Sequence, residues 1–132
     1  MRLNSDCIRD ILLAVEDDSD FNHSMEYYKN SDSNNSRLKK YSHDEVIYHI
    51  NQCNLSGLLL NVHFYDGAIH ITIGDLSPEG HKFLSNIRED NIWNGVKSVA
   101  KKIGSTSLSA LTQIASNVIT ELIKAQFQIT SP

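Results

Sequence analysis

The stretch that decides the fold runs from residue 42 to residue 80 and reads SHDEVIYHINQCNLSGLLLNVHFYDGAIHITIGDLSPEG. Its first part predicts a helix, because Ser42 and Glu45 have the spacing of a capping box. One apolar stripe follows on this helix: Val46, Ile50 and Cys53. The LSPEG phrase at the end predicts the start of another helix, with Ser77 as its N-cap and Pro78 in its first turn.

The middle of this stretch predicts a two-stranded β-hairpin over residues 60–73. The Asp66-Gly67 pair favours a two-residue turn, because both positions of that turn take positive φ. Such a turn pairs Tyr65 with Ala68 and His63 with His70. The apolar side chains then share one face of the hairpin: Leu60, Val62, Phe64, Ile69, Ile71 and Ile73.

Helical patterns flank the hairpin on both sides. Residues 4–16 predict a helix that starts at the N-cap Asn4, and residues 17–41 have the composition of loops, with short strands at 25–28 and 38–41. After the hairpin, a helix break is expected near residue 90, Gly104 ends the next helix, and a last helix runs to about residue 127. We therefore expect an α+β domain over residues 1–90 and a helical extension over residues 91–132, packed on it or mediating dimerisation.

The composition indicates an ordinary globular protein. The chain has 132 residues, 40% of them hydrophobic, and a net charge of −4, which suits a single domain with its own core. No membrane span or signal peptide is recognisable, so a cytoplasmic location is expected. Cys7 and Cys53 lack the spacing of a metal or redox motif and are expected to be buried thiols.

A helix that leads directly into a two-stranded hairpin resembles the layout of a winged helix, with residues 42–54 in the place of the recognition helix. The chain also resembles the family called domain of unknown function 2513, which occurs in bacteria, phages and prophages. The phrases that carry this resemblance include Met1-Arg2-Leu3-Asn4, Arg9-Asp10-Ile11-Leu12-Leu13, Tyr48-His49-Ile50 and Leu76-Ser77-Pro78-Glu79-Gly80-His81. The resemblance implies a winged-helix-type domain with C-terminal helices in a phage or prophage context, and it transfers no catalytic residue.

One functional hypothesis is binding of duplex DNA by helix 42–54 and the hairpin. Three polar side chains are expected to project outward from this helix: Tyr48, Asn51 and Gln52. Amide side chains of this kind bind adenine edges. Three bases precede the helix and are expected to contact phosphates: Arg37, Lys39 and Lys40. The acids at the helix start, Asp44 and Glu45, and the net negative charge oppose this hypothesis.

The favoured hypothesis is a non-catalytic protein-interaction module of a regulatory or accessory kind. The last predicted helix has apolar side chains in steps of three and four, the spacing of heptad a and d positions. Self-association, or docking of a protein partner, is expected through Leu108, Leu111, Ala115, Val118 and Leu122. The sequence has no nucleophile elbow and no phosphate-binding glycine loop, so neither an enzyme activity nor a cofactor is expected.

His63 and His70 are the one pair that invites a metal-binding hypothesis, since the predicted register places them opposite each other. A structural zinc site needs four protein ligands and a catalytic site usually needs three. Two histidines on a solvated strand face are therefore the favoured interpretation, and no metal is expected.

Overall fold

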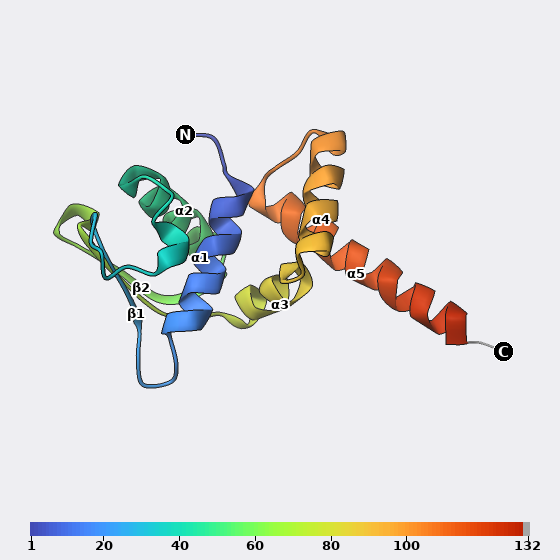
Figure 1. Ribbon diagram of the computed structural model, residues 1–132, viewed down its shortest axis with the longest axis horizontal. Coiled ribbons are helices and arrows are strands. Elements are labelled where there is room, and N and C mark those ends of the chain that lie inside the picture. Colours follow the sequence, from blue (N-terminus) through green and yellow to red (C-terminus); the bar gives the residue numbers. More distant parts are fainter. Residues whose placement is uncertain (131–132) are drawn as a thin grey trace. The chain divides into compact units, whose positions relative to one another are not determined.

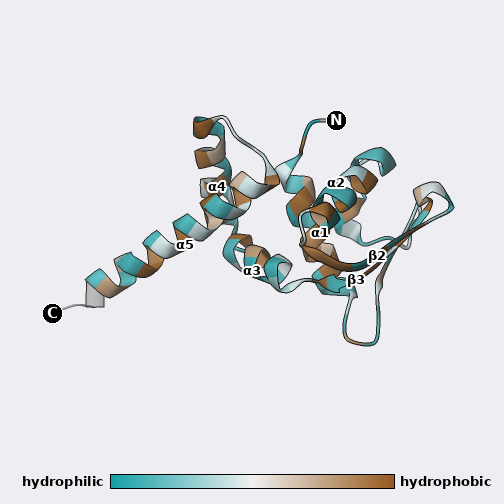
Figure 2. Cartoon of the chain, turned by 180° about the vertical axis from the view of Figure 1, so that it is seen from behind, coloured by the Kyte–Doolittle hydropathy of each residue, from teal (hydrophilic) through white to brown (hydrophobic). Residues whose placement is uncertain are grey.

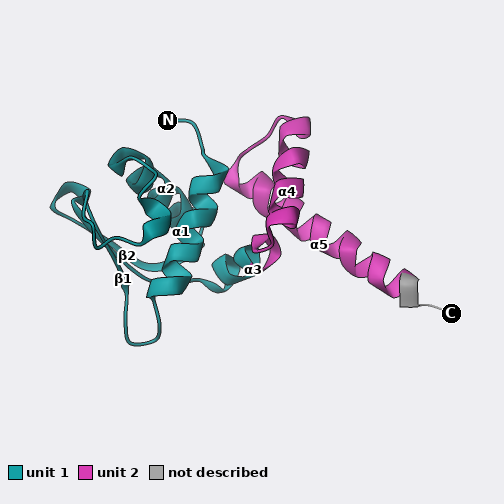
Figure 3. Ribbon diagram, in the orientation of Figure 1, with its two compact units in different colours: residues 1–84 teal, residues 85–132 magenta. Residues whose placement is uncertain are grey.

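The computed structural model describes residues 1–130 and confirms the α+β class. The elements follow in the order α1 (Ser5–Asp18), β1 (Met25–Tyr28), η1 (Ser36–Leu38), α2 (His43–Leu55), β2 (Leu59–Tyr65), η2 (Asp66–Ala68), β3 (His70–Leu76), α3 (Pro78–Ile87), α4 (Asp90–Ile103) and α5 (Leu108–Thr130) (Figure 1). The chain divides into two compact units, residues 1–84 and residues 85–132 (Figure 3). The division falls a few residues before the predicted boundary after residue 90.

Unit 1 is built on two helices whose predicted N-caps are confirmed. The Asn4 side chain accepts hydrogen bonds from the backbone N–H groups of Asp6 and Cys7, at 3.1 and 3.3 Å, and Ser42 Oγ accepts one from Glu45 N–H at 3.1 Å. The Glu45 carboxylate accepts a bond from Asn4 Nδ2 at 3.4 Å. Each cap satisfies helix N–H groups that have no partner inside the helix, and the last bond links the starts of α1 and α2.

A three-stranded antiparallel sheet in the order β1-β3-β2 completes unit 1. Helix α1 contacts β1 and β3, while α2 contacts α1 and β2 (Figure 1). Where β1 pairs with β3, four side chains are fully or almost fully buried: Met25, Tyr27, Ile71 and Ile73. Their alternation along β1 and β3 gives each strand one buried face and one face toward solvent, as the pleat of a strand requires.

The predicted short strand at 25–28 is confirmed as β1, but the one predicted at 38–41 is wrong. Residues 36–38 form the short 3-10 helix η1 instead. The Asn35 side chain accepts a hydrogen bond from Arg37 N–H at 3.0 Å, and this cap starts a helical turn where a strand was expected.

The outer edge of β1 is occupied by the buried side chain of Asn34. Its Oδ1 accepts a hydrogen bond from Tyr28 N–H at 2.9 Å, and its Nδ2 donates one to the Tyr28 carbonyl at 2.6 Å. These are the two bonds that a neighbouring strand would otherwise make to Tyr28.

The predicted hairpin is confirmed, but its register is wrong by two residues. Tyr65 pairs with His70 and Val62 with Ile73, so the turn contains the four residues 66–69. Asp66, Gly67 and Ala68 all have positive φ, at 52°, 66° and 71°, which makes a wider turn than the expected two-residue one. Because the shift is an even number, residues that pair across the strands still share a face. Of the predicted apolar face, Ile71 and Ile73 are buried, whereas Leu60 and Phe64 of β2 are 44% and 41% exposed and Ile69 leaves the strand.

The LSPEG motif, residues 76–80, attaches the start of α3 to the turn between α2 and β2 through hydrogen bonds. Ser77 is buried and is the N-cap of α3, as predicted, because its Oγ accepts a hydrogen bond from Gly80 N–H at 3.0 Å. The same Oγ donates a hydrogen bond to the Gly57 carbonyl at 2.5 Å. The Ser77 N–H donates to the Leu58 carbonyl at 3.0 Å. A Cβ atom at position 80 would lie 2.1 Å from the Leu58 carbonyl oxygen. Only glycine fits this approach.

Unit 2 is dominated by the helical hairpin of α4 and α5, which pack against each other. The predicted break is confirmed, since α3 ends at Ile87 and α4 begins at Asp90. Gly104 ends α4 in the left-handed region, at φ 80°, and Ser107 Oγ caps α5 by accepting a bond from Ala110 N–H at 3.1 Å. The buried side chains of the two helices include Trp93, Val96, Ala100, Leu108, Leu111 and Ala115. Across residues 1–130, no helix is both long and apolar enough to cross a membrane.

Candidate functional site

The bases predicted to meet DNA phosphates are largely engaged within the chain. Arg37 Nε donates to the Asp17 carboxylate at 2.8 Å, and Lys40 Nζ lies 3.0 Å from the Asp10 carboxylate. Both acids belong to α1, so the two ion pairs fasten residues 37–40 to that helix. Lys39 is exposed. A base that is already paired with a carboxylate contributes less to phosphate binding.

The predicted base-reading side chains of α2 differ in their exposure. Asn51 is exposed, Gln52 is half-buried, and Tyr48 is half-buried with its ring edge-on to His49. Asp44 is exposed at the start of the same helix. The surface of α2 therefore offers amide groups beside a carboxylate.

His49 is a buried residue whose role was not predicted from the sequence. Its Nδ1 donates a hydrogen bond to the Glu45 carbonyl at 2.7 Å, and its Nε2 accepts one from Asn4 N–H at 2.8 Å. The ring thereby links α2 to the first residue before α1. Nothing in the local sequence distinguishes this histidine from an exposed one, because its partner lies 45 positions away.

A polar cavity of about 480 Å³ opens beside these helix starts, lined by Asn4, Asp6, Arg9, Asp10, Lys40, Tyr41 and Glu45. Its central contact is the hydrogen bond that the Tyr41 hydroxyl donates to the Asp10 carboxylate, at 2.5 Å. Burial, followed by this bond, raises the pKa of Tyr41 well above its ordinary value. Asp10 of α1 thus binds both Tyr41 and Lys40, so the cluster connects α1 to the segment that precedes α2.

The predicted facing of His63 and His70 is wrong because of the two-residue shift in the turn. His63 lies opposite Thr72, and His70 lies between Tyr28 and Tyr65 in the register. The His70 ring stacks on both tyrosine rings, with centroid distances of 4.2 Å to Tyr28 and 5.1 Å to Tyr65. Among residues 1–130, no group of three or more His, Cys, Asp or Glu side chains is placed to hold a metal ion.

The predicted self-association residues fall into two groups. Leu108, Leu111 and Ala115 are buried, whereas Val118 is half-buried and Leu122 is 47% exposed. Helix α4 has 14 residues and α5 has 23, so the later turns of α5 extend beyond what α4 can cover. Ile123 and Phe127 are 51% and 70% exposed, and Figure 2 shows hydrophobic segments recurring along α5.

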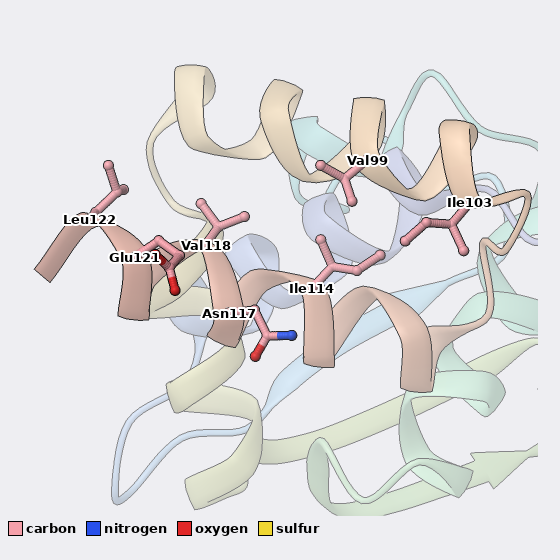
Figure 4. A pocket seen from close by; sticks show the side chains of 7 residues that line it. All are labelled: Val99, Ile103, Ile114, Asn117, Val118, Glu121 and Leu122. Atoms are coloured by element: carbon pink, nitrogen blue, oxygen red, sulfur yellow. The ribbon is translucent and has the colours of Figure 1, made fainter. Parts of the chain in front are cut away.

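An apolar groove of about 410 Å³ runs along the α4–α5 hairpin (Figure 4). It is lined by Val99, Ile103, Ile114, Asn117, Val118, Glu121 and Leu122, and we call it the α4–α5 groove. Val99 and Ile103 from α4 face Ile114 from α5 at one end, and Glu121 and Leu122 mark the other end (Figure 4). Val99 and Ile103 are 37% and 65% exposed. An apolar surface of this kind suits contact with another apolar surface.

Sequence reasoning found the α5 part of this groove but not the α4 part. The signal for α4 was present, because Ile92, Val96, Val99 and Ile103 recur at helical spacing. That stripe is split in the structure, with Val96 buried and Ile103 exposed. Periodicity alone does not tell which members of a stripe are covered within the chain.

Both cysteines are free and buried, as expected. Burial raises the pKa of the Cys7 thiol to about 12, and burial likewise raises the pKa of Cys53. The thiols are therefore neutral and shielded, in contrast to the exposed, low-pKa thiols that react.

Native protein is expected not to react with a thiol reagent such as Ellman's reagent, whereas the unfolded chain should release two equivalents of the reagent's thiolate product. Rapid modification without unfolding would contradict this.

The same thiols give a pH dependence with a definite sign. An unfolded thiol ionises above about pH 8.5, while folded Cys7 stays protonated up to about pH 12. The free energy of unfolding is thus fully retained below pH 8.5 and falls above it, by about 1.4 kcal/mol per pH unit for each thiol. Urea midpoints measured at about pH 8 and pH 10 should drop less in the Cys7→Ala/Cys53→Ala variant than in the wild type. Equal slopes would refute the assignment.

Comparison with known proteins places the chain in a family. An uncharacterised protein of Haemophilus influenzae is 28% identical over 127 residues, which cover 93% of this chain and 99% of that protein. No solved structure matches the chain. The family model described as "Hypothetical protein (DUF2513)" matches residues 2–107, which is most of the chain and includes every element before α5. The chain therefore belongs to the DUF2513 family.

Proposed function

We propose that this protein is a non-catalytic protein-interaction module, in a regulatory or accessory role, and that the α4–α5 groove is its docking element. The observation that carries the proposal is the groove itself, with side chains such as Ile103 and Leu122 left 65% and 47% exposed. Such exposure is unfavourable unless another surface covers it, because burying apolar area yields roughly 25 cal/mol per Å². Glu121 is the sole titratable side chain in its lining, which does not suit acid–base chemistry.

In this proposal unit 1 is a winged-helix-type scaffold. The support is its topology: α1, β1, the short η1, α2 and then the hairpin β2–β3, with β1 on the far side of β3. Helix α2 then takes the position of a recognition helix and β2–β3 that of a wing. A fold of this kind does not by itself imply DNA binding, since function depends on the residues placed on it.

The test is site-specific photo-crosslinking in cells. A benzoylphenylalanine that replaces Val118 in the groove should yield a discrete crosslinked protein, identified by mass spectrometry. The matched control replaces Thr120, an exposed residue on the same helix outside the groove lining. If the Val118 position gives no adduct, or gives the same adducts as the Thr120 position, the proposal fails.

Duplex DNA binding by α2 and the β2–β3 hairpin is the second candidate. The specific support is the same topology together with exposed Asn51 and half-buried Gln52 on α2. Fluorescence anisotropy of a labelled duplex at two salt concentrations tests it, because phosphate contacts weaken steeply as salt rises. Binding at low salt that is lost at high salt, and lost in an Asn51→Ala/Gln52→Ala variant, would support this candidate. The absence of binding at low salt would remove it.

A further inference from the structure

We propose that the occupant of the α4–α5 groove is the same groove of a second copy of this chain, so that two α4–α5 hairpins form an antiparallel four-helix bundle around a two-fold axis. This inference rests on the proposed function and names its partner. It makes the groove an isologous interface, in which each copy presents and receives the same residues.

The first argument is the shape of the open surface. A helical hairpin buries one stripe of each helix in the contact between them and leaves a second face along the seam. Here that face is the groove, in which Val99 and Ile103 of α4 are exposed, Val118 of α5 is half-buried and Ile114 is already buried. Two helix pairs that cover such faces mutually bury them in a core of four helices.

The second argument is charge complementarity along the groove. Lys102 is exposed and precedes Ile103 by one residue, about 100° around α4. It is thus the base next in sequence to Ile103, which lines one end of the groove. Glu121 lines the opposite end (Figure 4). An antiparallel two-fold arrangement brings the Lys102 end of each copy to the Glu121 end of the other, whereas a parallel arrangement would place like charges together.

The third argument is that α5 carries little charge that would oppose its own copy. In residues 108–130 the charged side chains are Glu121 and Lys124, which form an exposed i,i+3 ion pair at 3.5 Å. The helix is therefore neutral overall. Glu121 can exchange its local partner for Lys102 of the other chain at little cost, because exposed pairs of this kind are weak.

The experiment is sedimentation velocity of the purified full-length chain up to about 100 µM, a range that detects dissociation constants of micromolar order. Wild type should sediment as a dimer of the 14.9 kDa chain. Val118→Lys should be monomeric, whereas Thr120→Lys, the matched control on the same helix, should remain dimeric. Far-UV circular dichroism of each variant establishes that it is folded, and Val118→Ser, a milder change, should weaken the dimer in the same direction.

A charge exchange tests the antiparallel arrangement. Lys102→Glu and Glu121→Lys should each raise the dimer dissociation constant about five-fold, as expected for an exposed ion pair turned into a repulsion. The double variant should return to about the wild-type value, since the coupling between paired residues is recovered. Loss of the dimer in Val118→Lys without recovery in the double variant would overturn the antiparallel arrangement.

A wild-type chain that remains monomeric at the highest concentration would overturn the second copy as occupant. The crosslinking experiment then separates the two proposals. A different protein crosslinked at position 118 would leave the proposed function standing with another partner, and a monomer without any crosslink at that position would remove both.

Discussion

Replacing Gly80 with alanine is expected to lower the free energy of unfolding of unit 1 by about 3 kcal/mol or more. The added Cβ would lie 2.1 Å from the Leu58 carbonyl oxygen, and the contact is with backbone, which has no rotamer to change. Either α3 or the turn at Leu58 must move, and movement breaks the hydrogen bonds that Ser77 makes to Gly57 and Leu58. Overpacking of a fitted site typically costs about 1–3 kcal/mol, and the lost bonds add to it.

Urea denaturation measures this effect, and the chromophores allow each unit to be followed. All five tyrosines lie within residues 1–84, and the single tryptophan, Trp93, lies in unit 2. The tyrosine signal in near-UV circular dichroism should therefore show the shift for Gly80→Ala. Gly95→Ala is the matched control, because a Cβ there meets nothing within 4 Å, and a helical alanine should stabilise by up to about 1 kcal/mol. Equal midpoints for Gly80→Ala and wild type would show that the clash is absent.

Replacement of His49 is the second change with a large expected effect. His49→Ala removes a fully buried ring and leaves Asn4 N–H without its acceptor. We expect a loss of about 3 kcal/mol, from the cavity and from the unsatisfied donor together. His49→Leu refills most of the volume but not the hydrogen bonds, so it should cost about 2 kcal/mol.

The control for His49 is His63→Ala, which removes an exposed imidazole. Its effect should stay within about 0.5 kcal/mol, as for most surface substitutions. The same urea titrations, followed by the tyrosine signal, give all three values. If His49→Leu matched the wild type, the hydrogen bonds from His49 to Asn4 and Glu45 would carry no net stability, and the ring would act by volume alone.

Much of the fold was predictable because its signals are local. The N-caps at Asn4, Ser42 and Ser77, the break before α4 and the left-handed Gly104 each depend on residues within one or two turns of the chain. The buried face of β3 was predicted for the same reason, since Ile71 and Ile73 alternate in sequence, whereas Leu60 and Phe64 of β2 were placed on that apolar face and are exposed. Local interactions of this kind need no knowledge of the tertiary structure.

The features that were missed depend on distant residues. The hairpin register depends on the turn conformation. Ala68 is left-handed as well as Asp66 and Gly67, so the turn is wider than the two-residue turn that was predicted. The bases Arg37 and Lys40 find their acids on α1, 20 and 30 positions earlier in the chain. Helix α4 is shorter than α5, so Leu108 and Leu111 are buried while Leu122 is exposed. The apolar stripe of α5 alone does not reveal this difference in burial.

The side chain of Asn34 has a consequence for aggregation. An open sheet can polymerise without limit only if both of its edges accept a further strand. In unit 1 the Asn34 amide occupies the backbone groups of Tyr28 at the β1 edge, so β2 is the more open edge. A sheet with one available edge can pair once with another copy and then has nothing left to extend. We therefore expect Asn34 to disfavour strand-to-strand association at the β1 edge, and so to oppose open-ended growth of the sheet.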